Sequence, residues 1–213
     1  MKIVSLNVGL PRLISWKGET FKTGIFKNPV EGRVKLRETN LDGDRQADLT
    51  VHGGPKKAVY GYPSEHYPYW RAELPNEQFA WGALGENFTT EGLLESDLKM
   101  GDRYRVGSAV VVVTTPRLPC FKLAAKFRRD DIIQRVLRSG FSGFYFSVAE
   151  EGEVGAGDEF QLLDREVPSL SIADFNRLYV SADPDPELLR RAVEVRNLPE
   201  SWRERYQARL DAI

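Results

Sequence analysis

The feature that most constrains the fold is a run of β-branched residues leading into two prolines and the only cysteine of the chain. Residues 109–115 (AVVVVTT) contain four consecutive valines and two threonines, side chains that favour a strand buried on both faces. Pro116 and Pro119 cannot donate backbone hydrogen bonds, so they predict the end of that strand. A helix is then predicted from Cys120 to Arg128, and its first turn would favour a thiolate.

Two interpretations of Cys120 stay open on these residues alone. A thiolate at a rigid strand end, with Arg117 and Lys122 close in sequence, is suited to bind a soft metal or to act as a nucleophile. However, Cys120 also shares one apolar helix face with the residues at i+3, i+4 and i+7. A lone cysteine on such a face is often a small and inert core residue.

The composition is that of an ordinary globular protein with one substantial core. Of its 213 residues, 41% are hydrophobic, and 30 basic against 31 acidic residues give a net charge of −1. This balance argues against a protein that coats nucleic acid. The sequence shows no export signal and no apolar run long enough to span a membrane. We therefore expect a cytoplasmic protein without a membrane partner.

The cysteine count also limits the redox chemistry. A single cysteine excludes an internal disulfide and suits a reducing compartment. Because the chain has no CxxC pair, a protein-held iron–sulfur cluster is not expected. GxGxxG and GxxxxGK[ST] motifs for nucleotides are missing too. Any redox reaction would therefore take its electrons from a separate reductase that carries a flavin or an iron–sulfur cluster.

A glycine-rich segment before the predicted strand at residues 58–62 is a second candidate site. His52, Gly53 and Gly54 precede a proline and two lysines, and paired glycines let backbone amides approach an anion closely. An ordinary glycine turn with solvated lysines is equally compatible with these residues. Asn87, in the glycine-bent loop 82–88, either hydrogen-bonds local backbone or contacts a ligand. His66, on a short helix begun by Ser64, is expected to pack or to face solvent.

The last 50 residues differ from the rest of the chain because they are predicted to be helical. Ser171 and Asp174 form a capping-box pattern, Asp185 precedes a proline, and Pro199 follows Leu198. These signals predict three short helices, which are too small to be stable alone. We expect them to pack on the β-rich part of the chain or to bind a partner.

Four motifs in order give the chain a family resemblance. The segments are GDRQADLTVHGGPKKAVYGYP (43–63), GALGENF (82–88), the strand ending in PRLPC (116–120) and VGAGDEF (154–160). Together they resemble the MOSC domain family, modules that bind sulfur and the molybdenum cofactor. The tail resembles the three-helix domain of its YiiM-like branch. The resemblance implies a mainly β fold with some α: a MOSC-type β-barrel domain at 1–163 and a three-helix domain at 168–213.

The resemblance also implies roles for particular residues. Cys120 would be the molybdenum ligand and the catalytic residue, and the metal would also be held by the dithiolene of a molybdopterin-type cofactor. The cofactor-binding residues that it implies are Lys27, Arg45, His52, Gly53 and Gly54, followed by Asn87 and Arg117.

The function implied is the reduction of N-hydroxylated compounds, such as hydroxylamino-purines, to amines. Flat substrates would stack on an aromatic side chain such as Phe121, Tyr67 or Trp70. The small-molecule substrate and the external reductase would be its partners, and the protein would be a monomer or a dimer. Two alternatives stay open: a carrier that holds cofactor or sulfur without turnover, and an interaction protein with a buried thiol.

Overall fold

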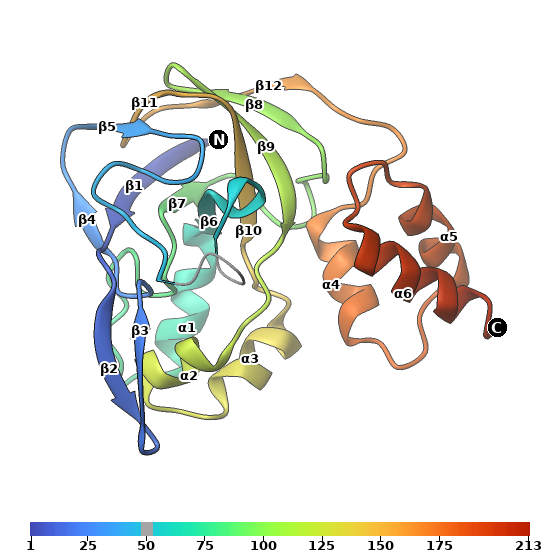
Figure 1. The fold of residues 1–213 in the computed structure, drawn as a ribbon, viewed down its shortest axis with the longest axis horizontal. Helices are drawn as coiled ribbons and strands as arrows, with labels where there is room; N and C mark the ends of the chain where they lie inside the picture. The colour runs from blue at the N-terminus through green and yellow to red at the C-terminus, as the bar shows by residue number, and fades with distance from the viewer. Residues whose placement is uncertain (48–52) are drawn as a thin grey trace.

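The computed structural model describes residues 1–47 and 53–213, and a large curved sheet with helices at one end and at one side organises them (Figure 1). In these residues the sheet has eight strands in the order β12–β8–β9–β10–β6–β7–β1–β4. Neighbouring strands are antiparallel except β6 and β7, which are parallel. The strands are β1 (Lys2–Val8), β4 (Asn28–Val30), β6 (Val59–Pro63), β7 (Phe88–Glu91), β8 (Arg103–Val106), β9 (Ala109–Pro116), β10 (Phe144–Glu150) and β12 (Phe160–Asp164).

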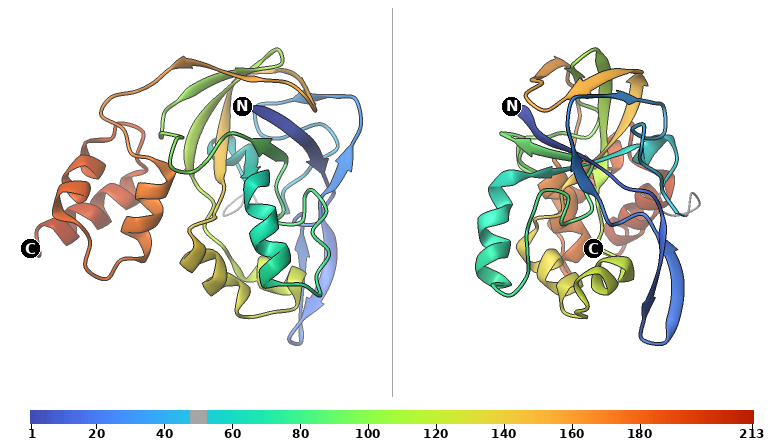
Figure 2. Two further views of the ribbon diagram at one scale, coloured as in Figure 1. Left: turned by 180° about the vertical axis from the view of Figure 1, so that it is seen from behind. Right: turned by 90° about the vertical axis from the view of Figure 1, so that its left-hand side faces the viewer.

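Two short antiparallel pairs and several helices complete the fold. The pairs are β2 (Arg12–Trp16) with β3 (Glu19–Thr23), and β5 (Arg33–Leu36) with β11 (Gly152–Gly155). The helical elements are the 3-10 turns η1 (Pro55–Lys57) and η2 (Ser64–His66), and the helices α1 (Tyr67–Glu73), α2 (Phe121–Phe127), α3 (Ile132–Ser139), α4 (Ile172–Val180), α5 (Pro186–Glu194) and α6 (Glu200–Leu210). Helices α1–α3 gather at one end of the sheet, and α4–α6 lie beside it (Figures 1 and 2). No helix in the described ranges is both long and apolar enough to cross a bilayer.

The valine-rich run forms the predicted strand. β9 pairs with β8 on one side and with β10 on the other, and most of its side chains are buried. The strand ends at Pro116, and α2 begins directly after Cys120. The prolines therefore end the strand and the helix starts as predicted, which fixes the cysteine between the two elements.

The sheet curves strongly without closing, so the expectation of a β-barrel is corrected. In the part of the chain that the structure describes, β12 and β4 stand at the two edges of the sheet. The turn before β12 reaches only the start of β1, where the Ile3 amide donates to the Asp158 carbonyl at 2.9 Å and the Phe160 amide to the Met1 carbonyl at 3.0 Å. β4 pairs with β1 only at Leu6–Val8, and the turn before β12 meets the other end of β1 through a single bridge between Lys2 and Glu159. An isolated bridge is not a strand ladder, so the described sheet is not a closed barrel. The fold is mixed α/β.

The tail forms the three helices that the capping signals predict. The Ser171 hydroxyl accepts from the Asp174 amide, and the Asp185 carboxylate accepts from the Glu187 amide, each at 2.9 Å. Buried residues of α4–α6 belong to the same apolar cluster as the sheet, and a second cluster surrounds α1–α3. The tail therefore packs on the sheet. The boundary between 1–163 and 168–213 stays a prediction.

Two glycines before β7 position the loop that leads from β3 to β4. Gly82 and Gly85 have φ angles of 84° and 90°, which other residues adopt only with strain. A Cβ on Gly82 would lie 2.9 Å from the Lys27 carbonyl oxygen, and one on Gly85 2.8 Å from Cγ1 of Ile25. Because these two glycines have no side chains, the loop that carries Lys27 can lie close to the backbone of residues 82–85.

Candidate functional site

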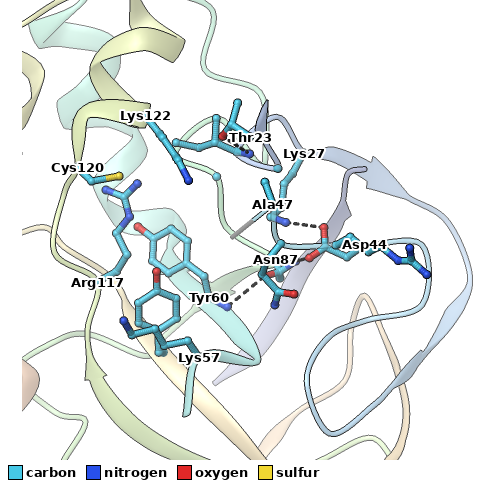
Figure 3. Close-up of a pocket in the computed structure, with 16 residues that line it drawn as sticks. Thr23, Lys27, Asp44, Ala47, Lys57, Tyr60, Asn87, Arg117, Cys120 and Lys122 are labelled. Carbon is cyan, nitrogen blue, oxygen red and sulfur yellow. Dashed lines mark hydrogen bonds and ion pairs between the residues drawn. The ribbon is translucent and has the colours of Figure 1, made fainter. Parts of the chain in front are cut away.

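A pocket opens beside Cys120 (Figure 3). It contains about 610 Å³ of empty space, counting the part open to solvent at its mouth. Its walls come from segments far apart in sequence: residues 23–27 after β3, residues 44–47, the loop 85–87, and residues 117–122 between β9 and α2. Tyr60 of β6 and Tyr145 of β10 also line it.

The pocket brings together most of the residues that the sequence singled out. Lys27, Arg45, Asn87, Arg117 and Cys120 all line it. The two other candidates that the structure describes are not part of this group. Gly53 and Gly54 do not line the pocket, although Lys57 of the 3-10 turn that follows them does. His52 lies outside the described residues.

Cys120 is half-buried at the start of α2 and opens onto the pocket, whereas Leu123, Ala124 and Phe127 on the same helix face are buried. This difference argues against an inert core cysteine. The guanidinium of Arg117 lies beside the sulfur (Figure 3). Burial alone would lower the pKa of Arg117, but the adjacent Tyr60 and Cys120 groups raise it overall.

The positive charge of Arg117 favours the thiolate form of Cys120, because opposite charges stabilise each other strongly where water is excluded. From the sequence we attributed this effect to the start of the helix and to the nearby charges of Arg117 and Lys122. However, α2 has only seven residues, so the fixed guanidinium is the better explanation.

The described residues that line the pocket carry an excess of positive charge. Arg45, Lys57 and Lys122 line it together with Arg117, and Lys122 extends into it from the first turn of α2. Asp44 is the one acidic residue among the described lining residues. Its carboxylate is paired with Lys27 at 2.5 Å, so it does not offset the other cations. Such a pocket is suited to an anionic ligand.

Asp44 and Asn87 hold the wall of the pocket in place. Besides Lys27, the Asp44 carboxylate accepts from the Gly9 amide at 2.9 Å and from Nδ2 of Asn87 at 3.0 Å. Nδ2 of Asn87 also donates to the Asn7 carbonyl, and Oδ1 of Asn87 accepts from the Tyr60 amide, both at 3.2 Å. Because the Asn87 amide is engaged at both ends, we infer that it positions neighbouring segments.

Two groups that the sequence did not single out hold segments next to the pocket: the buried carboxylate of Glu86 and the partly buried ammonium of Lys126. The Glu86 carboxylate is fully buried and accepts from the Gly82 and Leu84 amides, the Thr89 hydroxyl and the Tyr67 hydroxyl. Burial raises its pKa. Lys126 of α2 donates to the carbonyls of Ile25 at 3.1 Å and Gly82 at 3.0 Å. Burial lowers its pKa to about 8.

Only one of the three aromatic candidates is available to a substrate. Tyr67 and Trp70 are fully buried, so the structure excludes them as stacking platforms. Phe121 is 49% exposed and directly follows Cys120. Its ring contacts the ring of Phe21 edge-on, with centroids 4.9 Å apart.

Comparisons with known proteins agree with this arrangement. The model of the MOSC domain family matches residues 48–161, just over half of the chain. The chain belongs to the MOSC family. Uncharacterized protein YflK from Bacillus subtilis (strain 168) is 40% identical over 211 residues, 99% of this chain and 95% of that protein. The crystal structure of YiiM from Geobacillus stearothermophilus has a TM-score of 0.79 at 36% identity, covering 98% of each chain.

A third relative of this MOSC protein has a name that indicates chemistry. A protein named "Reductase" from Gibberella moniliformis (strain M3125 / FGSC 7600) is 35% identical over 164 residues. The matched region covers 76% of this chain but only 29% of that protein. Together with the YiiM likeness over nearly the whole chain, these matches support the YiiM-like branch inferred from the sequence.

The residues of the pocket fit a molybdenum cofactor, which MOSC domains bind in general. In residues 1–47 and 53–213, no three His, Cys, Asp or Glu side chains are grouped so as to hold a metal. A cofactor that brings its own dithiolene sulfurs and a phosphate needs one thiolate and several cations. Cys120, Arg117, Lys122, Lys57 and Arg45 offer that set.

Breaking the ion pair at the pocket wall should destabilise the protein. The Lys27 and Asp44 side chains are 7% and 1% exposed, so Asp44→Ala leaves a buried ammonium without its partner. We expect the free energy of unfolding in urea to fall by about 3–5 kcal/mol. The double variant Asp44→Ala/Lys27→Met removes both charges and should recover part of that loss, although the Gly9 amide and Nδ2 of Asn87 still lose their acceptor. Equal stability of the single and double variants would contradict a buried charge pair.

Lys126 should make the free energy of unfolding increase with pH in the alkaline range. Its pKa is about 8 in the folded protein, against an ordinary value of 10.5. Below pH 8 Lys126 is therefore charged in both the folded and the unfolded protein, and burying the charged ammonium destabilises the fold to the full extent. Between about pH 8 and 10.5 the unfolded chain binds more protons, so stability rises with pH, by about 1.4 kcal/mol per unit of pKa difference. Urea unfolding across this range should show the wild type gaining stability relative to Lys126→Met. A constant difference between the two proteins would count against this assignment.

Proposed function

We propose that this MOSC protein is a molybdenum-cofactor-dependent oxidoreductase that reduces N-hydroxylated compounds to amines. The observation that carries the proposal is the single thiol in a cationic pocket, with Arg117 beside the sulfur. Membership of the MOSC family and the relative named "Reductase" support it. The overall reaction is R–NHOH + 2e⁻ + 2H⁺ → R–NH₂ + H₂O. A separate reductase in the cytoplasm would supply the electrons.

The side chains of the pocket would divide between holding the cofactor and keeping the thiol reactive. Cys120 would ligate the metal, and Arg117 would keep the sulfur ionised before the metal binds. Lys122, Lys57 and Arg45 would bind the phosphate and the polar edge of the pterin through charge-assisted hydrogen bonds. When bound, the cofactor supplies a two-electron metal centre that can reduce an N–O bond.

The exposed ring beside the thiol would orient the substrate. Phe121 directly follows Cys120 and is half exposed, although it is not itself among the residues that line the pocket, and Phe21 contacts the edge of its ring. A flat hydroxylamino-purine stacked on this ring would bring its N–OH group toward the bottom of the pocket. Tyr60 and Tyr145, whose pKa values are raised by burial, would stay protonated and neutral.

Turnover of a defined substrate tests the proposal. Protein from a molybdenum-replete host, with reduced methyl viologen as electron donor, should convert 6-hydroxylaminopurine to adenine. Chromatography would measure the adenine formed. We expect Cys120→Ser to lose molybdenum and pterin, measured by elemental analysis and fluorescence. Its rate should fall by roughly 100-fold or more, because even outer-shell changes at metal sites cost up to about that factor.

A matched control and two contrary outcomes make this test decisive. Lys35→Ala removes an exposed lysine of β5 that does not line the pocket, and it should leave both metal content and rate unchanged. A wild-type protein that carries the cofactor yet forms no adenine, and passes the cofactor to an apo-enzyme, would instead be a carrier. A Cys120→Ser variant that keeps metal and activity would remove the thiol from the mechanism.

A further inference from the structure

A second cleft lies between the body of the protein and its helical tail. It is bounded by the end of α3, by α4 and by residues 94–96, and it contains about 860 Å³ of empty space, counting the part open to solvent. Among the described residues, none that lines this cleft also lines the cysteine pocket. The cleft is therefore a separate cavity, and the proposed reduction does not use it.

One part of the cleft is apolar. Leu94, Leu137, Phe141 and Val180 line it, and Val180 remains 52% exposed although it is a large hydrophobic residue. An apolar wall that stays open to water gains free energy when a hydrophobic body covers it. This wall is therefore suited to the ring of a small aromatic molecule.

Two arginines provide positive charge at the same cleft. Arg138 comes from α3 and Arg177 from α4, and both residues line the cleft. The Arg177 side chain is 69% exposed and its ion pair with Asp174 is long, at 3.6 Å. A loosely paired guanidinium can bind a carboxylate through two parallel hydrogen bonds.

The cleft is also lined by a polar pair that is rigidly held. Nε2 of His66 lies 2.7 Å from Oε2 of Glu95, and Oε1 of Glu95 accepts from the Gly143 amide at 2.8 Å. Both side chains are less than a tenth exposed. The His66 ring stacks on the Phe141 ring with centroids 3.7 Å apart, so the aromatic wall has a fixed orientation. A preformed wall reduces the entropic cost of binding a ligand.

We propose that this cleft is a second ligand site, for a small aromatic carboxylate. The ring of the ligand lies on Phe141 and the neighbouring aliphatic side chains, and its carboxylate binds Arg138 and Arg177. Three observations carry this inference. The cleft is large, part of its lining is apolar, and two different helices each contribute an arginine to it. It is independent of the cofactor, because none of the described residues of the cysteine pocket takes part.

Binding of naphthalene-2-carboxylate to the full-length protein tests the proposal. The protein is first treated with iodoacetamide, which alkylates the sole cysteine and so blocks the other pocket. Isothermal titration should still give saturable binding of one ligand per chain. The neutral analogue 2-naphthalenemethanol, which has the same rings without the charge, should bind at least about tenfold more weakly, as expected for the loss of a charge-assisted contact.

Variants assign the binding to this cleft. Arg138→Ala/Arg177→Ala should weaken the binding of naphthalene-2-carboxylate by roughly tenfold or more. Arg190→Ala/Arg191→Ala removes two arginines of α5, neither of which lines the cleft, and should change nothing. Circular dichroism would confirm that both variants fold. The absence of saturable binding, equal affinity for the neutral analogue, or loss of binding on alkylation would each overturn the proposal.

Discussion

A buried guanidinium beside a thiol determines which ligands the cysteine pocket of this MOSC protein is suited to bind. Arg117 and Cys120 sit three residues apart, where β9 ends and α2 begins, and Arg117 is almost fully buried. A buried arginine is stable only with negative charge or acceptors around it. Tyr60, Tyr145 and the sulfur supply these groups. The same charge favours the thiolate that a soft metal requires.

Buried polar contacts between distant segments support that pair. The Asp44 carboxylate joins Gly9, Lys27 and Asn87, and the Glu86 carboxylate holds the bend before β7. Buried carboxylates with several donors are costly to disturb, because each lost partner leaves a charge or dipole unsatisfied. The pocket wall is therefore rigid, and a rigid wall can present its outward cations to a ligand without reorganising.

The loop between α3 and β10 joins the two cavities. Nδ2 of Asn176, on α4, donates to the Gly140 carbonyl at 3.1 Å and to the Ser142 hydroxyl at 2.8 Å. On the other side of the loop, the Tyr60 hydroxyl donates to the Ser142 carbonyl at 2.8 Å, and the Arg117 amide donates to the Gly143 carbonyl at 3.3 Å. The helical tail is thus connected by hydrogen bonds to the residues beside the thiol.

Local signals in the sequence predicted individual strands and helices, but they did not predict that the sheet stays open. The valine run, the prolines and the capping residues at Ser171 and Asp185 identified β9 and the tail helices, since these depend on neighbours in sequence. The open edge of the sheet depends on how far β12 reaches along β1, which no local pattern encodes. Asp44 and Lys126 were missed for a similar reason, because their roles follow from contacts with distant segments. Tyr67 and Trp70 carried no signal of their burial.

Chemical labelling of the single thiol tests the central claim most directly. Iodoacetamide treatment followed by mass spectrometry reports on Cys120 alone, because the chain has one cysteine. If the cofactor binds at this sulfur, the thiol should be labelled in cofactor-free protein and protected in protein loaded with the molybdenum cofactor. Equal labelling of the two preparations would contradict a cofactor site built on Cys120 and Arg117.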